Sequence, residues 1–435
     1  MPDFAHLTNI VLLTIIILLI QPTLRRWHKH LHKRWRTFKQ RQWKPASPHD
    51  CALCCNQVGL QVIRQHDVVP YHLTKSPRGR KKALCTRGFA CPNPDCTYFG
   101  IHDDSAHALV GYGTHNGIQR FKCQSCAKVF TSRIGTPLYY LKTDPQQVEL
   151  VLWFLAEGVD LSVMIRFTGH ADATIARWLN RMGCHSQLWH NLLFHNLIFV
   201  VLQLDELYTR VRGVASARWL WLAIDPVSKV IPSLHIGGRT KHDAFALAHD
   251  IQLRLDPDHI PAFTTDGLRT YFYAITAHFG NWVRPPRARK DHWRVSDDLQ
   301  HGMLIKRKHK NRKTFTTTRM AYGKRSDLFD KLQLVGLRRL IQTAFIERVN
   351  LTFRQGVSCL SRRTWAYAQS DYHLLMHCEW FRAYYHFVRP HESLRLPLPG
   401  LKRRYRSRTP AMALGLTDRV WTVRDLLHYP VPQAT

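Results

Sequence analysis

Acidic residues are scarce in this sequence: 30 Asp and Glu stand against 63 Lys and Arg, which leaves a formal net charge of +33 over 435 residues. Because excess charge of this size costs self-repulsion in a compact chain, it argues against an ordinary metabolic enzyme. It predicts a polyanionic partner, either nucleic acid or an acidic membrane surface. Hydrophobic residues make up 45% of the chain, which excludes general disorder. At about 150 residues per domain, the length predicts two to four units.

Several patterns of known chemistry are also missing. The chain has no G-x-x-x-x-G-K-[ST] loop, which argues against ATP use, and no nucleophile elbow for Ser/His/Asp chemistry. It has no positively charged stretch ahead of an apolar run with a cleavage site, as a secretory signal would have. Its 11 cysteines gather in short-spaced pairs instead of forming a disulfide framework. They therefore predict metal binding in a reducing compartment.

Residues 1–45 combine an apolar segment with a basic leader. Residues 4–24 carry no Asp, Glu, Lys or Arg and just reach the about 20 residues that a membrane span needs, but Pro22 interrupts them. Basic residues and spaced aromatics from Arg25 to Lys44 predict an amphipathic helix. Three interpretations stay open: a membrane anchor, which would leave the rest of the protein in the cytoplasm, a packing or oligomerisation helix, or an upstream extension of the reading frame.

Two cysteine pairs in residues 46–132 have the spacing of a zinc ribbon. They are Cys91 and Cys96 in CPNPDC, and Cys123 and Cys126 in FKCQSCAKVF. Two close pairs that are 26 residues apart can bring four thiolates to one tetrahedral Zn²⁺, and strand-like segments flank the second pair. A second zinc site is a weaker hypothesis, because no standard spacing selects its ligands among Cys51, Cys54, Cys55, Cys85, His66 and His72.

Residues 133–190 have the pattern of a helix-turn-helix. We expect one helix from Pro145 to near Gly158, a short one over 162–167 closed by Gly169, and a third over 171–182. Three polar residues lie off the apolar face of the third helix, and we expect them to bind DNA: Arg177, Asn180 and Arg181. A plain three-helix bundle is the alternative.

The next segment, 195–395, predicts an α/β core. Expected strands cover 197–204, 219–224, 230–236 and 262–265, and expected helices cover 241–255 and 270–279. Three strands, a helix, a fourth strand and a helix is the order of an RNase H-like core. Asp205 ends the first expected strand and Asp266 follows the fourth. Because these two strands are neighbours in that fold, we expect both carboxylates in one site.

A third carboxylate lies far downstream, on an expected helix over 340–355. Glu347, Asn350, Leu351 and Arg354 share one face of it. Three carboxylates can hold two Mg²⁺ ions about 3.5–4 Å apart, which activate the attacking oxygen and stabilise the leaving oxygen in phosphodiester chemistry. Two other acids compete. Strand alternation predicts that Glu206 points away from Asp205, and Asp225 has the position of a turn residue before Pro226.

The stretches LDELY, TTDG and IERVNLTFRQ resemble the DDE motif of bacterial insertion-sequence transposases. With the cysteine pairs, YYHFVRPHESL and RTPAMALGLTDRVWT, the chain is similar to their zinc-ribbon subgroup over about residues 85–425. The resemblance implies that Asp205, Asp266 and Glu347 bind the catalytic metals, that Asn350 supports them, and that Arg354 contacts DNA or its phosphate. It further implies a DNA-associated cytoplasmic enzyme that acts on element ends and target DNA. Because two ends must be joined, we expect a homo-oligomer.

One departure from a minimal core is its length: 81 residues separate Asp266 from Glu347. The added length holds a basic insertion, residues 284–325, which is interpreted either as a DNA contact or as a solvated loop, and we expect the fifth strand within it. Residues 396–435 form a basic tail. Two alternatives to a transposase stay open: a non-catalytic zinc-ribbon and helix-turn-helix regulator, and an inactive, membrane-tethered transposase remnant.

Overall fold

The structure is a computed structural model, and it describes residues 71, 86, 89–101, 103–286, 289–307, 315–398 and 404–431. The chain divides into two compact units, one holding Met1–Gly111 with Lys122–Lys128 and the other holding Tyr112–Phe121 with Val129–Thr435. Among the helices of the described residues, none is both long and apolar enough to cross a membrane. The expected apolar segment, the basic leader and the candidate ligands of a second zinc site lie outside the described residues.

The cysteine-rich region contains a short helix and a small sheet. Helix α3 covers Asp103–Ala106, and the sheet has the order β1 (Leu109–His115), β2 (Ile118–Cys123) and β3 (Val129–Thr131). Strands β2 and β3 stand on either side of the second cysteine pair, as the FKC and KVF segments predict. The pair therefore lies in the tight turn between two strands, where the Cys123 amide donates to the Lys128 carbonyl.

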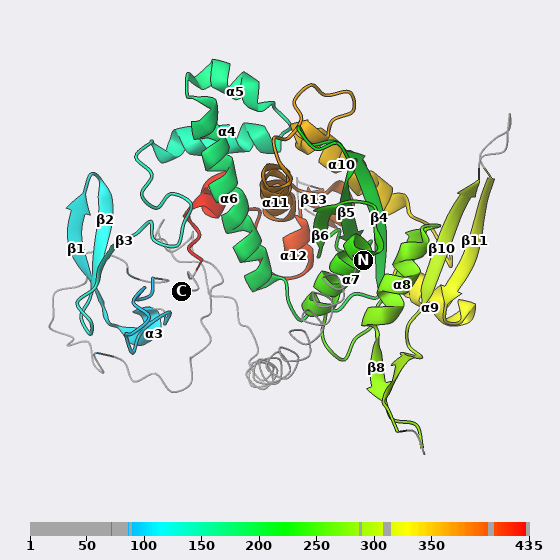
Figure 1. The fold of residues 1–435 in the computed structure, drawn as a ribbon. Coiled ribbons are helices and arrows are strands. Elements are labelled where there is room, and N and C mark those ends of the chain that lie inside the picture. Colours follow the sequence, from blue (N-terminus) through cyan, green and yellow to red (C-terminus); the bar gives the residue numbers. More distant parts are fainter. Residues whose placement is uncertain are drawn as a thin grey trace, which may run out of the picture. The chain divides into compact units, whose positions relative to one another are not determined.

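A mixed six-stranded sheet forms the centre of the second unit (Figure 1). Its order is β11-β10-β7-β4-β5-β6. The strands are β4 (Val201–Thr209), β5 (Arg218–Ile224), β6 (Leu234–Gly237), β7 (Ala262–Asp266), β10 (His301–Arg307) and β11 (Phe315–Tyr322). Strand β4 runs parallel to β7 and antiparallel to β5, and β10 runs parallel to β7. The predicted neighbourhood of the first and fourth strands is thus confirmed, and the fifth strand does lie within the basic insertion.

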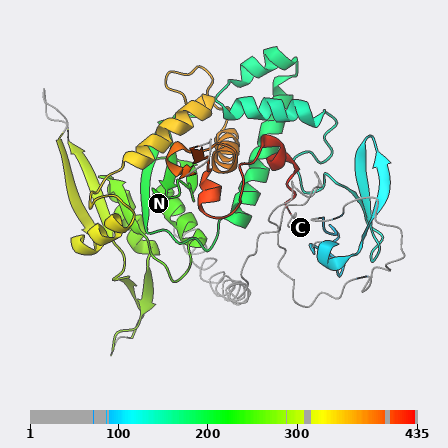
Figure 2. The same ribbon diagram turned by 180° about the vertical axis from the view of Figure 1, so that it is seen from behind.

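Helices cover both faces of this sheet. Figure 1 shows α7 (Lys241–Arg254) and α8 (Arg269–His278) in front of it, and the view from behind shows α10 (Ala344–Gly356) on the opposite side (Figure 2). Each helix buries an apolar stripe, such as Leu247 and Ile251 of α7. Side chains at consecutive positions of a strand point to opposite faces of the sheet and can therefore contact different helices. This applies to Asp205 and Glu206, which are consecutive residues of β4.

The helical segment contains α4 (Pro145–Ala156), α5 (Leu161–Thr168) and α6 (Asp172–Leu193), and α6 packs against α11 (Asp371–Phe387). The first two match their predicted ranges, with Gly169 in the left-handed conformation after α5. The predicted end of α6 at Met182 is wrong. Gly183 does not end the helix but lets α11 approach, because a Cβ there would collide with the backbone of Met376. Gly183 thus serves helix packing.

Three predicted boundaries of the core are also wrong. The first strand does not end at Asp205, because β5 pairs with β4 as far as Thr209 and supplies backbone partners beyond the aspartate. Strand β6 begins only at Leu234, after Pro232, which has no N–H to donate to a neighbouring strand. Helix α10 begins at Ala344, four residues later than expected. There the side-chain oxygen of Gln203, on β4, accepts hydrogen bonds from the amides of Phe345 and Ile346, both at 3.1 Å.

The remaining elements lie in the second unit and connect or flank this core. They are β8 (Gly280–Val283), β9 (His292–Val295), α9 (Arg325–Leu334), η1 (Ser358–Leu360), η2 (Glu392–Leu394), β12 (Leu396–Pro397), β13 (Tyr405–Arg406), α12 (Pro410–Ala413) and α13 (Val423–His428). Strands β8 and β9 form a separate two-stranded hairpin, as do β12 and β13. The basic insertion is therefore largely built of strands in its described part.

Candidate functional site

Asp205 lies in the middle of β4, between the strand's two sheet neighbours. Its carboxylate accepts a hydrogen bond from the side-chain amide of Asn350, on α10, over 2.7 Å. Burial, together with the nearby charges of Glu206, Asp266 and Glu347, raises the pKa of Asp205 to about 7. A carboxylate whose charged form is disfavoured by burial and by neighbouring acids gains from binding a cation.

Asp266 ends β7, the parallel neighbour of β4, as its position before Gly267 predicts. One of its oxygens accepts the Leu268 amide at 2.9 Å, which fixes the turn that follows the strand. Asp205, Glu206 and Asp266 each offer one oxygen, and these oxygens all lie within 4.8 Å of one another. The structure therefore places Asp205 and Asp266 in one group that could hold a metal ion.

Strand alternation predicts that Glu206 points away from Asp205, but one of its oxygens lies within 4.8 Å of an oxygen of Asp205. The hydrogen-bond partners of the Glu206 side chain differ from those of Asp205. The Tyr271 hydroxyl donates to the Glu206 carboxylate at 2.9 Å, and Arg239 forms an ion pair with this carboxylate. Nη2 of Arg239 is also 4.0 Å from a carboxylate oxygen of Asp266, so the charge of this guanidinium lies near both carboxylates. Burial and the charge of Asp266 raise the pKa of Glu206.

Asp225 behaves as the sequence predicts. Its carboxylate accepts hydrogen bonds from the backbone amides of Val227 and Ser228, at 3.2 and 2.7 Å, and so closes the turn after β5. This is a structural role in an Asx-type turn. Asp225 is not a member of the acidic group.

Glu347 lies in the first turn of α10 and is not in the acidic group. Lys306, on β10, forms an ion pair with it, and the Thr343 hydroxyl donates to it at 2.9 Å. Both side chains of the ion pair are about half exposed (49% and 46%), so the contact is open to solvent and to a competing ligand. Glu347 therefore lies near enough to affect Asp205 electrostatically, but it is engaged elsewhere.

The two supporting residues differ in position. Asn350 lies one turn after Glu347 and contacts Asp205 directly. Arg354 lies a further turn along α10, and its guanidinium donates to the backbone carbonyls of Leu360, at 3.0 Å, and Tyr208, at 3.3 Å. Arg354 thus ties α10 to the end of β4 and to the segment after α10, which is a structural contact.

Two cations beside the carboxylates were missed in the sequence. Arg239 follows β6 in the GGRT segment, and Lys306 lies in the basic insertion. Neither has a local pattern that marks it, because Arg239 reaches the acids from the loop after β6 and Lys306 reaches them from β10. One indirect signal is present in the sequence. With 63 Lys and Arg against 30 Asp and Glu, each acid has more than one cation that could pair with it, so some basic residue near the carboxylates is expected.

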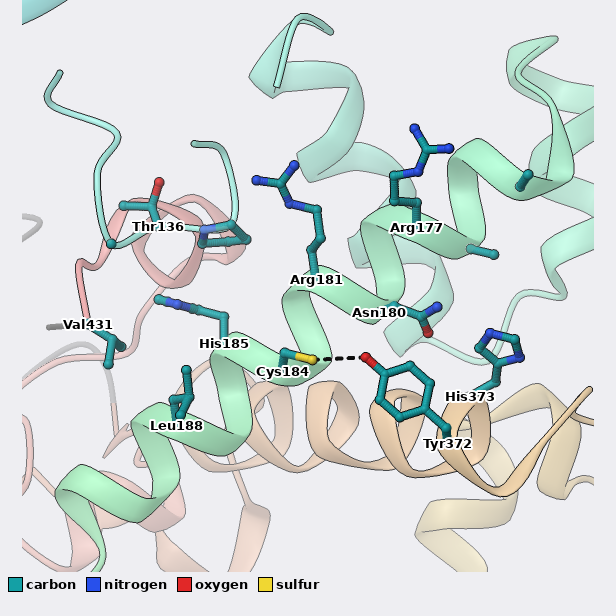
Figure 3. Close-up of a pocket in the computed structure, with 14 residues that line it drawn as sticks. Thr136, Arg177, Asn180, Arg181, Cys184, His185, Leu188, Tyr372, His373 and Val431 are labelled. Atoms are coloured by element: carbon teal, nitrogen blue, oxygen red, sulfur yellow. Dashed lines mark hydrogen bonds between the residues drawn. The ribbon is translucent and has the colours of Figure 1, made fainter. Parts of the chain in front are cut away.

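The predicted DNA-binding residues of α6 line a shallow open hollow of about 620 Å³ (Figure 3). Arg177, Asn180 and Arg181 lie on one side of it, and Tyr372 of α11 lies across from them. Arg181 also donates to the Tyr139 carbonyl. The residues that line the hollow include Arg177 and Arg181 but no acid, so the two guanidinium groups would favour an anion there.

The four cysteines of the two pairs come together in the first unit. Cys91, Cys96, Cys123 and Cys126 each offer a sulfur, and all four sulfurs lie within 4.8 Å of one another. Cys91 and Cys126 are 3.5 Å apart, and Cys96 and Cys123 are 3.8 Å apart. Burial alone would raise the pKa of Cys126, but hydrogen bonds from the Lys128 amide and other donors lower it to about 7. The cluster could hold one metal ion.

No protein-family model matches the chain, and no curated protein matches it. The geometry therefore carries the functional argument alone. It provides one group of oxygen ligands on adjacent strands, two flanking cations, one cluster of thiols and a basic hollow.

Proposed function

We propose that this protein is a DDE-type transposase, which binds the ends of an insertion element and catalyses metal-dependent DNA strand cleavage and strand transfer. One observation carries the proposal. Asp205 and Asp266, on adjacent parallel strands, come together beneath a helix that supplies Asn350 and Glu347, in a chain with a net charge of +33. Carboxylates that lie this close together repel one another, so the group is costly unless it binds a cation.

The sheet supports an RNase H-like core. Its strands β6-β5-β4-β7-β10 correspond to the order 3-2-1-4-5, with the first three antiparallel and the last three parallel. Strand β11 adds an edge outside this pattern. The agreement concerns fold, and the function depends on the site that the fold carries.

The acidic group fits Mg²⁺, because its donors are hard carboxylate oxygens that lie close enough together to share an ion. Asp205 and Asp266 would hold it, and Glu347 would complete the ligands after leaving Lys306. Bound Mg²⁺ would supply an activated attacking oxygen and stabilise the leaving oxygen of the phosphodiester. The chain itself orients Asp205 through Asn350 and places the charge of Arg239 near Glu206 and Asp266.

The cysteine cluster fits structural Zn²⁺. With Zn–S bonds of about 2.3 Å, the sulfurs of a tetrahedral site lie about 3.8 Å apart, close to the separations of the two sulfur pairs. We assign this zinc ribbon and the α4–α6 helices to DNA binding, and the charge of the chain supports that assignment. A homo-oligomer that holds two element ends in the cytoplasm completes the proposal.

One observation favours a second function. Glu347 is paired with Lys306 and lies outside the acidic group, as it could in a protein that binds DNA without cutting it. The alternative is therefore a non-catalytic DNA-binding regulator, for which the carboxylates are dispensable.

The test measures cleavage of duplex DNA that carries the inverted repeats flanking the gene, with Mg²⁺ present. Asp205→Ala and Glu347→Ala should each abolish cleavage but leave DNA binding intact, because neither substitution removes a positive charge or changes the zinc ribbon or α6. Asp297→Ala is the matched control: this acid is 79% exposed and pairs only with Arg294 among the described residues. Cleavage that survives both active-site changes would contradict the metal assignment. Binding without any cleavage by the wild type would favour the regulator.

A further inference from the structure

Arg239 is held in place by the backbone of its own loop. This loop joins β6 to α7, and the Trp221 indole donates to the Gly238 carbonyl at 2.9 Å. Thr240 caps α7 reciprocally with Asp243, and a Cβ on Gly237 would collide with the Asp243 carboxylate. The segment on both sides of Arg239 is therefore fixed by packing and capping.

The guanidinium of Arg239 uses only one of its edges. Nε donates to Glu206 at 2.8 Å, Nη2 forms an ion pair with the same carboxylate, and the guanidinium lies 4.7 Å from the centre of the Trp219 ring. Nη1 makes no hydrogen bond to any residue within the described ranges. Because the guanidinium is a planar fork of five donors, its second edge stays free for a planar or tetrahedral oxyanion.

Arg239 differs in exposure from the arginine of a second buried ion pair in this chain. The buried pair Glu379 and Arg382 is hidden on both sides, with side-chain exposures of 3% and 2%. In the Arg239 pair the glutamate is equally hidden, at 2%, but the arginine is 43% exposed. Glu206 also has the Tyr271 hydroxyl as a second partner. The buried Glu206 thus holds Arg239 in place, while the guanidinium of Arg239 remains exposed to solvent beside Asp266.

We propose that Arg239 binds the phosphate group at which the DNA strand is cut, donating from its free edge to a non-bridging oxygen. This inference rests on the proposed transposase function. Nη2, the nitrogen shared by the paired and the free edge, lies 4.0 Å from a carboxylate oxygen of Asp266, so the guanidinium lies beside the carboxylates that would hold the metal. A phosphate bound there would receive the guanidinium from one side and the metal site from the other. Glu206 is then a positioning residue that orients Arg239.

The experiment compares DNA binding to two duplexes by fluorescence anisotropy in Ca²⁺. One is the terminal-repeat duplex, and the other is the same duplex with an uncharged methylphosphonate at the cleaved position. Arg239→Lys keeps the charge but loses the fork, and the double variant Arg239→Ala/Glu206→Gln avoids leaving a buried charge unpaired. Arg218→Ala is the control, because Arg218 forms a similar ion pair with Asp371, at 2.9 Å, and is not in contact with the acidic group.

We expect both Arg239 variants to bind the natural duplex about tenfold or more weakly, the effect of one charge-assisted hydrogen bond. They should bind the methylphosphonate duplex as the wild type does, and Arg218→Ala should change neither. Equal losses on both duplexes, or no loss on the natural one, would overturn the role of Arg239. Cleavage in Mg²⁺ separates the two proposals: a wild type that cuts while the Arg239 variants bind normally removes only this inference. A wild type that never cuts removes the transposase function and this inference with it.

Discussion

The side-chain amide of Asn350 donates a hydrogen bond to the carboxylate of Asp205 over 2.7 Å, although 145 residues separate them in sequence. It joins α10 to the centre of β4. The amide oxygen of Asn350 is buried and has no partner among the described residues. The amide is therefore committed as a donor, and one carboxylate oxygen of Asp205 is fixed while the other can face a metal.

Replacing Asn350 tests this positioning. Asn350→Ala should lower the cleavage rate about 10- to 100-fold, as is usual for partners of metal ligands, with DNA binding unchanged. Thr352→Ala is the matched control, since Thr352 lies on the same helix but its hydroxyl donates, within the described part of the chain, only to the Arg348 carbonyl. A cleavage rate equal to that of the wild type would show that Asp205 needs no orientation by α10.

The pairing of Lys306 with Glu347 leads to a second prediction. If this pair must open before Glu347 binds the metal, then Lys306→Met should reduce the Mg²⁺ concentration that gives half-maximal cleavage by a few fold. The measurement is a Mg²⁺ titration of the cleavage rate at saturating DNA. Because the pair is half exposed, its own contribution is at most about 1 kcal/mol. An unchanged or higher Mg²⁺ requirement would mean that Lys306 does not compete with the metal.

The cysteine cluster predicts a defined metal content. Cys96→Ser should lower the zinc content of the purified protein by one equivalent, measured by elemental analysis, because three remaining thiolates do not hold structural zinc as well as four. Cys184→Ser is the control: Cys184 lies on α6, where its sulfur contacts the Tyr372 hydroxyl at 3.1 Å. Equal zinc in both variants would contradict the assignment of the cluster.

Buried histidines predict instability in acid. Burial lowers the pKa of His185, His301 and His377 to about 4, so each stays neutral in the folded unit. In the unfolded chain each binds a proton below about pH 6.5, and the free energy of unfolding therefore falls as the pH drops from about 7 toward 4. At about pH 5.5 each histidine should cost about 1 kcal/mol relative to about pH 8.

The acids whose pKa burial raises, Asp205, Glu206 and Glu379, oppose this trend. They are outnumbered, because burial lowers the pKa of further histidines, among them His190 and His386. Urea unfolding followed by tryptophan fluorescence should give a lower midpoint at about pH 5.5 than at about pH 8. A higher midpoint in acid would mean that the carboxylates dominate.

Local sequence was sufficient for elements whose ends carry their own signals. Helix α5 ends at a left-handed Gly169, and α7 begins at a capping box of Thr240 and Asp243. It was insufficient where a distant residue supplied the partner. Helix α10 begins where Gln203 of β4 caps it, and α6 continues past Gly183 because α11 packs there. Helix and strand ends are decided by hydrogen-bond partners, and those partners were far away in the sequence.

The candidate site divides in the same way. The sequence by itself determined that the four cysteines form one cluster, because their two close pairs have the spacing of a metal site. It also determined that Asp205 and Asp266 lie in one site, which follows from the order of the strands and helices. Only the tertiary structure decided which further charges join them. It brought Glu206 and Arg239 to the acids and paired Glu347 with Lys306, because electrostatic interactions depend on distances in space that no local pattern encodes.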